Sequence, residues 1–490
     1  MQPSTNISQH QLLQRRTFLA RSGVSLGSIA AAELLSRDAR SADRSTTPAE
    51  ATGLPSGLAG QGSPPHFPPR VKRVIFLYMA GGPSHLETFD YKPKLDQLDG
   101  QPMPTSFTTG QPIAQLQGAE LKVQGHLSKF SQVGDNGLWL SDFLPHHRRI
   151  VDKICVVRSM LTEQINHDPA HTFMNTGTAI SGRPSLGSWI NYGLGSDSDS
   201  LPGFVVLTSI GGRNPQPIAT RQWSAGFLPS RYQGVEFSGS GDPVHYVRNP
   251  PGVSDNLQQQ VIETVRDLDT HRQSFVDNPE LATRIAAYEL AFRMQTAVPD
   301  LMDMSDEPEH VLRRYGANPG DGSFASNCLL ARRLAESGVR FIQLYHRGWD
   351  HHGDLVKHMN TCCGLTDQPT AALLQDLAQR GMLDDTLVIW GGEFGRTPMF
   401  QGKGGPGRDH HIKGFSMWLA GGGIKPGYAH GETDELGYNS VVSAVHVRDL
   451  HATILQQLGI DHQRLSVKYQ GLDMRLTGVE PARVVNEILV

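Results

Sequence analysis

Six short apolar runs, each closed by a glycine-rich or polar stretch, constrain the fold more than any other feature of this chain. They are VKRVIFLYMA from residue 71, KICVVRSM (153–160), GFVVLTSI (203–210), GVRFIQLYH (338–346), TLVIWGGE (386–393) and GFSMWLAGGG (414–423). Runs of this length are short for helices, and continuous apolar runs are typical of strands that are buried on both faces. The runs therefore predict the strands of a parallel sheet.

Helical patterns lie between the apolar runs. They cover 280–298, 323–338, 369–383 and 447–459. Strands that alternate with helices predict an α/β fold, and we expect a three-layer sandwich around a mostly parallel sheet. We expect a single domain over 71–490. Two segments rich in Gly, Gln and Pro, near 95–140 and 211–255, are interpreted as surface insertions.

The first 70 residues differ in composition from the rest. Arg15 and Arg16 precede a short, weakly apolar run rich in Ala, Gly and Ser, which is the layout of a twin-arginine export signal over 1–40. The alternative is an accidental arginine pair before an amphipathic helix. Residues 41–70, rich in Ser, Pro and Gly, predict a linker. We therefore expect export to the periplasm or the cell exterior. Because the apolar run is short, we expect no stable membrane span after signal removal.

The charge of the chain argues against one class of partner. With 44 Lys and Arg against 48 Asp and Glu, the net charge is -4 at pH 7. Since no basic field is available to hold a polyanion, we expect no nucleic-acid partner. The sequence carries no indication of an oligomeric state.

The loops that follow the predicted strands hold many of the histidines. In parallel α/β sheets, ligands bind beyond the carboxyl ends of the strands, so these loops are the candidate site. They read GGPSHLETFD, TEQINHDPAH, RGWDHHGD, GGEFGRTP and GGPGRDHH. Because several of these polar clusters are expected at one edge of the sheet, a common site is favoured over clusters that arose independently.

Three of these loops offer metal ligands. GWDHHGD contains Asp350 and His352, GGEFGRTP contains Glu393 and Arg396, and GRDHH contains His410 next to a second histidine. Imidazole and carboxylate groups bind zinc, manganese and iron in proteins, and an arginine can clamp anionic oxygens. The alternatives are solvated histidines capped by carboxylates and a Glu-Arg salt bridge that tightens a loop.

The stretch NHDPAHTFMNTG (166–177) allows two interpretations. In the structural one, Asp168 caps a helix and Pro169 is its first residue. His167 then lies just outside the helix and His171 in its first turn, which weakens a simple two-histidine chelate. In the functional one, His167 lies at a helix N-terminus, where an anion is favoured.

The order of these loops resembles the alkaline phosphatase and sulfatase superfamily. The motifs GGPSHLETFDYKP, GWDHHGD, GGEFGRTP, GRDHH, AGGGIKPG and GLDMRLT resemble, more closely, exported sulfatase-like proteins catalogued as domain of unknown function 1501. The resemblance covers about 71–490. It implies an alkaline phosphatase/sulfatase-like fold.

The resemblance also implies roles for individual residues. The sulfatase nucleophile opens a C-x-P-x-R pattern followed nine positions later by Thr-Gly, and His167, with Thr176-Gly177 at that spacing, occupies the nucleophile position. A paired Asp that binds metal in sulfatases is replaced by Gly81-Gly82. The Asp-His-Gly motif of phosphatases resembles Glu393-Phe394-Gly395, which keeps the carboxylate and loses the imidazole. Asp350 with His352 resembles the preceding ligand pair.

These implications lead to two functional hypotheses. The first is an exported, metal-dependent hydrolase of sulfate or phosphate esters, acting on a small-molecule or polysaccharide ester with a divalent metal such as Zn, Ca or Mn. The second is a non-catalytic binding or scaffold protein with a degenerate metal site.

Within the hydrolase hypothesis, each candidate residue has a role. Arg396 and His411 would neutralise anionic oxygens, and His167 would be nucleophile, general base or ligand. The metal ligands would be Asp350, His352, Glu393 and His410. Either His85 or His167 would complete the set.

Overall fold

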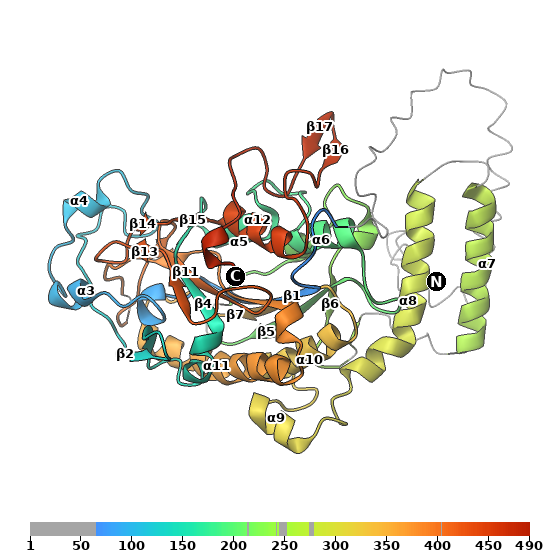
Figure 1. Ribbon diagram of the computed structural model, residues 1–490, viewed down its shortest axis with the longest axis horizontal. Helices are drawn as coiled ribbons and strands as arrows, with labels where there is room; N and C mark the ends of the chain where they lie inside the picture. The colour runs from blue at the N-terminus through green and yellow to red at the C-terminus, as the bar shows by residue number, and fades with distance from the viewer. Residues whose placement is uncertain (1–64, 213–214, 242, 245–251, 274–278, 403) are drawn as a thin grey trace, which may run out of the picture. The chain divides into compact units, whose positions relative to one another are not determined.

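A computed structural model describes the chain from residue 65 to 490, apart from 213–214, 242, 245–251, 274–278 and 403 (Figure 1). The predicted export signal and most of the predicted linker lie outside the described residues. The chain divides into two compact units. One includes Tyr246–Gln295, with the helix α7 (Asp255–Gln273) and most of α8 (Pro279–Met302); the other holds the sheet and the candidate site.

The core of the second unit is a nine-stranded, mostly parallel sheet with the strand order β12-β4-β11-β8-β1-β7-β5-β6, and β15 pairs with β4. Its strands are β1 (Arg73–Ala80), β4 (Ile154–Leu161), β5 (Phe204–Ile210), β6 (Val235–Phe237), β7 (Phe341–Arg347), β8 (Thr386–Gly391), β11 (Phe415–Ala420), β12 (Tyr428–His430) and β15 (Val445–His446). Only β11 runs antiparallel to its neighbours β4 and β8. All six apolar runs are thus confirmed as strands of one sheet.

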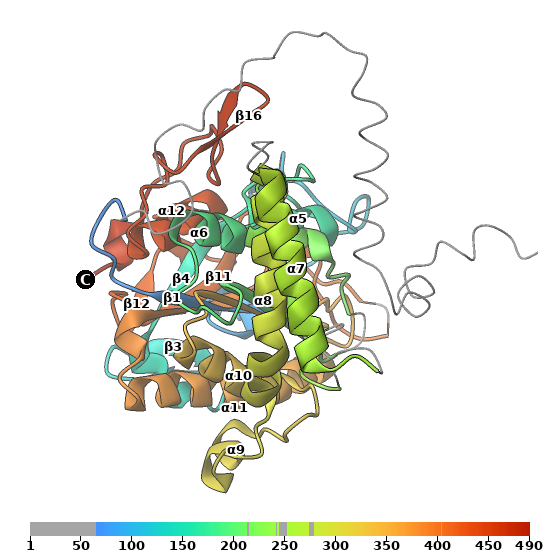
Figure 2. The same ribbon diagram turned by 90° about the vertical axis from the view of Figure 1, so that its right-hand side faces the viewer.

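Helices cover both faces of this sheet, as the alternating pattern predicts. Figures 1 and 2 show α5 (His167–Thr176), α6 (Leu186–Leu194) and α12 (Val447–Gln457) on one face, and α10 (Phe324–Glu336) and α11 (Leu355–Gln379) on the other. Seven of the eight residues of β1 are buried, which explains the continuous apolar run, because a central strand meets a helical layer on each side. The three-layer α/β sandwich is confirmed.

The remaining elements are short. They are α3 (Pro93–Gln97), α4 (Thr105–Thr108), α9 (Glu309–Tyr315), the pair β2 (Phe130–Val133) and β3 (Leu138–Ser141), β9 (Gly395–Arg396) and β10 (His410–His411), β13 (Glu432–Thr433) and β14 (Ser440–Val442), and β16 (Val467–Tyr469) and β17 (Leu472–Met474). Within 95–140, several apolar side chains form a small buried cluster apart from the main core, with contributions from two later loops. They include Leu95, Met103, Leu116 and Val123, packed with Met399 and Leu436.

One predicted helix differs from the structure in its start. The pattern at 369–383 is the second half of α11, which begins at Leu355 and contains Pro369. A proline within a helix lacks the donor for one backbone hydrogen bond, so it resembles a helix start in sequence. Within the described residues, no helix has the length and apolar composition that crossing a bilayer requires.

Candidate metal centre

Four loops from different parts of the chain meet at one edge of the sheet. His167 is the first residue of α5 and follows β4; Asp350 and His352 follow β7; Glu393 follows β8; and His410 lies in β10. Since β4, β7 and β8 run in the same direction, their carboxyl ends share an edge of the sheet. The topology therefore brings distant loops together where the strand pattern predicts a site.

Three imidazoles converge on one carboxylate oxygen. The Nε2 atoms of His167, His352 and His410 lie 3.3, 2.9 and 3.3 Å from Oδ1 of Asp350. One ligand atom from each of these four residues lies within 4.8 Å of the others. Three nitrogens and one oxygen at this spacing fit a single divalent cation.

The hydrogen bonds behind each imidazole fix which nitrogen faces the centre. The Nδ1 of His410 donates to the backbone oxygen of Ile165 at 2.8 Å, and the Nδ1 of His352 donates to Oε1 of Gln401 at 2.6 Å. In a neutral ring, the opposite nitrogen, Nε2, then carries a lone pair. Such outer hydrogen bonds orient histidine ligands in metalloproteins. The centre is therefore lined by lone pairs and a carboxylate, which attract a cation.

Glu393 holds His167 from the other side. Its Oε1 accepts a hydrogen bond from Nδ1 of His167 at 2.7 Å, and its Oε2 lies 3.6 Å from Nδ1 of His171. The hydroxyl of Tyr78 lies 2.9 Å from the same His171 nitrogen. His167, His171 and Glu393 form a second group whose ligand atoms lie within 4.8 Å of one another. Glu393 thus supports the first centre through His167 and does not itself join the four converging atoms.

The start of α5 differs from the prediction. The helix begins at His167, after Asn166, so Asp168 is not its cap. His167 and His171 are therefore one helical turn apart, and their rings stack at 5.9 Å. Both histidines therefore lie on one face of α5, although the predicted cap argued against such a face. Both rings contact Glu393.

Gly81 and Gly82 contribute backbone atoms to the contacts of Glu393 and Arg396. The backbone N–H of Gly81 donates to both oxygens of Glu393, at 3.0 and 3.2 Å. The backbone oxygens of Gly81 and Gly82 accept hydrogen bonds from Arg396. A Cβ atom at Gly81, where φ is +126°, would lie 2.5 Å from the backbone nitrogen of Asp350. Glycine here allows the two loops to approach closely.

Arg396 contacts the centre from within the protein and holds Asp350 in place. Its guanidinium is buried and lies 2.8 Å from Oδ1 of Asp350, and it also donates to the backbone oxygens of Gly82 and Arg408. This differs from the expected role at substrate oxygens, because its N–H groups are engaged by the protein. Arg396 instead orients Asp350.

The electrostatics favour charged carboxylates and a neutral His410. Burial alone would raise the pKa of Asp350, but the charge of Arg396 above all, and the three histidines around Oδ1, lower it far below its usual range. Burial likewise opposes ionisation of Glu393, yet His171 and His167 lower its pKa to about 2. Burial lowers the pKa of His410 to about 4. These are the protonation states that a metal requires.

His167 behaves differently from the other imidazoles. Burial would lower its pKa, but its hydrogen bond to Glu393 and the charges of Asp350 and Glu393 outweigh burial and raise the pKa above 6.5. The position between two carboxylates therefore favours a positive charge at or beside this ring.

A family model described as "Protein of unknown function (DUF1501)" matches residues 71–489. The chain belongs to this family. No curated protein matches it.

Among solved structures, this DUF1501 protein is similar to the phosphonate monoester hydrolase SpPMH from Silicibacter pomeroyi, with 11% identity, 85% of this chain and 76% of that chain covered, and a TM-score of 0.34. It is also similar to the lipoteichoic acid synthase LtaP from Listeria monocytogenes, with 10% identity, 86% and 78% coverage and a TM-score of 0.35. A TAB5 alkaline phosphatase mutant with bound Mg has 10% identity, 74% and 94% coverage and a TM-score of 0.31.

Besides Glu393 and Arg396, two more predicted site residues of the DUF1501 protein lie outside the converging group. Nε2 of His411 donates to the backbone oxygen of Tyr438, and burial lowers the pKa of His411 to about 3. Nε2 of His85 lies 2.8 Å from the backbone oxygen of Gly437, and burial lowers its pKa. Neither belongs to the groups of described residues that could hold a metal ion. His167, and not His85, belongs to the converging group, and the buried ring of His411 stacks on Tyr438.

Sequence reasoning missed the polar groups behind the ligands. Gln216 donates to Oδ2 of Asp350 at 2.9 Å, and Gln401 and Gln115 contact His352. The two residues Gln115 and Gln216 lie in the segments interpreted as surface insertions. Glutamines in such segments carry no spacing signal, whereas His171, one turn after His167, was visible in the sequence.

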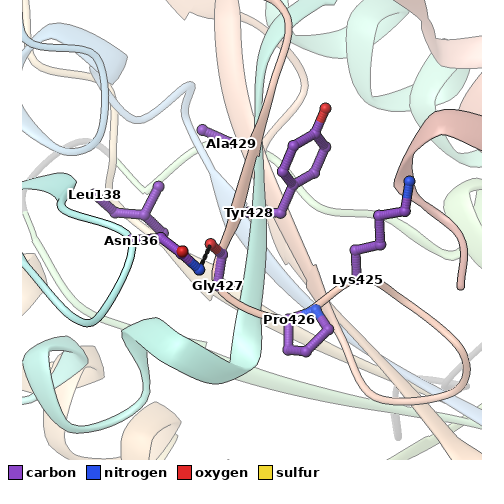
Figure 3. Close-up of a pocket in the computed structure, with 7 residues that line it drawn as sticks. All are labelled: Asn136, Leu138, Lys425, Pro426, Gly427, Tyr428 and Ala429. Atoms are coloured by element: carbon purple, nitrogen blue, oxygen red, sulfur yellow. Dashed lines mark hydrogen bonds between the residues drawn. The ribbon is translucent and has the colours of Figure 1, made fainter.

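A pocket of about 400 Å³ lies away from this centre (Figure 3). Tyr428 in its wall pairs with Cys155 at the start of β4, whereas His167 follows the end of β4. The pocket is therefore at the opposite edge of the sheet. In its wall, Asn136 donates to the backbone oxygen of Gly427 at 2.7 Å.

Proposed function

We propose that this protein is an exported, metal-dependent hydrolase of sulfate or phosphate esters. The observation that carries the proposal is the convergence of three Nε2 atoms on Oδ1 of Asp350, with the Nδ1 of each ring engaged elsewhere. The loop order that resembles sulfatases supports the choice of ester. Small molecules and polysaccharides are the proposed substrate classes.

Zinc or manganese suits the centre better than calcium does. The donors are three imidazole nitrogens and one carboxylate oxygen. Calcium takes six to eight oxygen ligands, whereas imidazole is a common ligand of zinc and manganese. A cation held by Asp350, His352, His410 and His167 would polarise an ester oxygen and stabilise the charge that develops on it.

The chain's own residues keep the ligands ready. Glu393 holds the Nδ1 proton of His167, so Nε2, which faces Asp350, can ligate a cation that takes the place of its proton. Arg396 keeps Asp350 ionised and oriented. His167 therefore acts as a ligand, because its Nε2 lies at the same 3.3 Å from Oδ1 as that of His410.

An ester panel tests this proposal. Zinc-loaded protein is expected to hydrolyse a sulfate or phosphate ester, and His167→Ala is expected to lose both activity and bound metal. Hydrolysis that is unchanged in His167→Ala would remove this residue from the mechanism. Metal retained with activity lost would instead make His167 a catalytic group and not a ligand.

One observation favours the non-catalytic alternative. The N–H groups of Arg396 are engaged within the protein, so the arginine expected to bind substrate oxygens does not reach them. Purified protein that binds no stoichiometric metal under any loading would support a binding or scaffold role.

Export is part of the proposal, and Arg15-Arg16 with the apolar run behind them supports it. The test is cell fractionation of the full chain and of an Arg15→Lys, Arg16→Lys variant. The parent is expected outside the cytoplasm and the variant inside it. Equal distribution of the two would contradict the twin-arginine route.

A further inference from the structure

A closed ring of hydrogen bonds joins His352 to two glutamines. Nδ1 of His352 donates to Oε1 of Gln401 at 2.6 Å, and Nε2 of Gln401 donates to Oε1 of Gln115 at 3.2 Å. The ring closes where Nε2 of Gln115 lies 3.2 Å from Nε2 of His352. Each donor in the ring faces an acceptor.

This ring fixes the direction of the Gln115 amide. Gln401 must present its oxygen to His352, so its N–H group faces Gln115 and takes the Gln115 oxygen. The N–H₂ end of Gln115 is then the end that faces the metal centre. A flipped amide would place two donors against each other.

The backbone of Gln115 is held as firmly as its side chain. Oδ2 of Asp409 accepts hydrogen bonds from the backbone N–H groups of Gln115 and Leu116, at 2.6 and 2.9 Å. Leu116 is buried in the small apolar cluster, whereas Gln115 is exposed. Asp409 also directly precedes His410, so the segment that carries Gln115 is attached to a ligand loop.

The chemistry of this donor selects an anionic ligand. Once His352 ligates a cation, its Nε2 lone pair is no longer available to Gln115. A partially positive N–H group that faces a cation interacts most favourably with a negatively charged oxygen lying between them. We propose that Gln115 donates a hydrogen bond to an anionic oxygen of the sulfate or phosphate group at this centre, which makes it a substrate-binding residue. This inference rests on the proposed function.

The test is the affinity of zinc-loaded protein for inorganic phosphate and sulfate, measured by calorimetry together with zinc content. Gln115→Leu removes the donor, and Gln115→Glu replaces it with a charged acceptor of the same shape. A hydrogen bond to a charged group corresponds to roughly a tenfold to hundredfold change in Kd. We expect the affinity for phosphate and sulfate to fall at least tenfold in Gln115→Glu and to fall in Gln115→Leu as well. The zinc content of both variants is expected to be unchanged. The matched control is Gln117→Ala, because Gln117 is exposed in the same segment and donates to Ile113.

The outcomes separate the inference from the function on which it rests. A parent protein that binds no zinc would overturn the proposed function, and the inference with it. Zinc-loaded parent that binds neither anion, or zinc-loaded Gln115→Glu and Gln115→Leu that bind phosphate as tightly as the parent, would overturn the role of Gln115 alone. If anion affinity fell as much in Gln117→Ala as in Gln115→Leu, the effect would belong to the whole segment. That result would also contradict the assignment of Gln115 as a substrate-binding residue.

Discussion

The Nε2 atoms of His352 and His410 lie 2.9 Å apart, while each Nδ1 donates to a carbonyl oxygen. Two imidazole lone pairs at this separation repel each other unless a positive charge lies between them. Oδ1 of Asp350, at 2.9 and 3.3 Å from the same atoms, adds a negative charge. The pair is therefore a candidate cation site, and the predictions below follow from it.

Zinc is expected to stabilise the folded protein through this pair. A ligand that binds only the folded state adds about 2.7 kcal/mol at a concentration of 100 times its Kd. Thermal unfolding with zinc and with a chelator measures this difference. The zinc-dependent rise in unfolding temperature should vanish in His352→Ala. It should persist in His310→Ala, which changes an exposed histidine. A shift of equal size in both variants would place the zinc elsewhere.

Replacing Glu393 by Gln is expected to weaken zinc binding by about 10-fold to 100-fold, because groups that orient a histidine ligand contribute to affinity on this scale. The carboxylate that holds Nδ1 of His167 becomes a neutral amide. Competition with a chelator measures the Kd.

The control for this variant is Glu87→Gln. Glu87 is a second fully buried glutamate, paired with Arg408 at 2.7 Å. Breaking that pair is expected to cost about 3–5 kcal/mol of unfolding free energy, with zinc affinity retained. If Glu393→Gln lowers stability and leaves the zinc Kd unchanged, the role given to Glu393 is wrong.

Gly81→Ala is expected to displace Asp350 and lower zinc affinity at least tenfold. The new Cβ would lie 2.5 Å from the backbone nitrogen of Asp350, and an alanine is strained at φ +126°. Gly110→Ala is the matched control, since Gly110 also has a positive φ of +73° but open space around its Cβ position. Chelator competition on both variants is the measurement. Equal zinc affinities would show that the close approach of the loops does not position Asp350.

Buried His451 is expected to make the protein less stable as pH falls from 6.5 to 4. Burial lowers the pKa of His451 to about 4, while its hydrogen bond to Met174 partly opposes this. Between these pH values the unfolded chain binds the proton and the folded chain does not, so stability falls by up to about 1.4 kcal/mol per pH unit from this group. Above pH 6.5 it has no effect.

The measurement is denaturant unfolding at several pH values, with chelator present. His451→Gln should show a shallower loss of stability than the parent between pH 6.5 and 4, whatever its stability at pH 7. Parallel curves for parent and variant would show that His451 does not titrate as described.

The sheet and its order of loops follow from the sequence because burial on both faces leaves a continuous apolar run. The sequence does not single out the individual candidate ligands. Asp350, His352 and His410 were predicted from loops that must share an edge, but His410 and His411 are consecutive strand residues, whose side chains point to opposite faces. Only packing decides which of them faces the centre.

The same limit applies to His351 and Arg396. His351 lies between two ligands, yet its Nε2 lies 3.0 Å from the backbone oxygen of Gly348, away from the centre. Arg396 reads as an anion clamp in sequence, but Gly81 and Gly82 bring carbonyl oxygens to its guanidinium. Backbone partners supplied by a distant loop leave no pattern in sequence.

Metal content tests the central claim most directly. Purified protein, loaded with zinc or manganese and freed of excess metal, should contain about one equivalent per chain by element analysis, and Asp350→Ala, if folded by circular dichroism, should contain none. A folded parent without metal, or a variant that retains the full equivalent, would contradict the assignment of His167, Asp350, His352 and His410 as a metal centre.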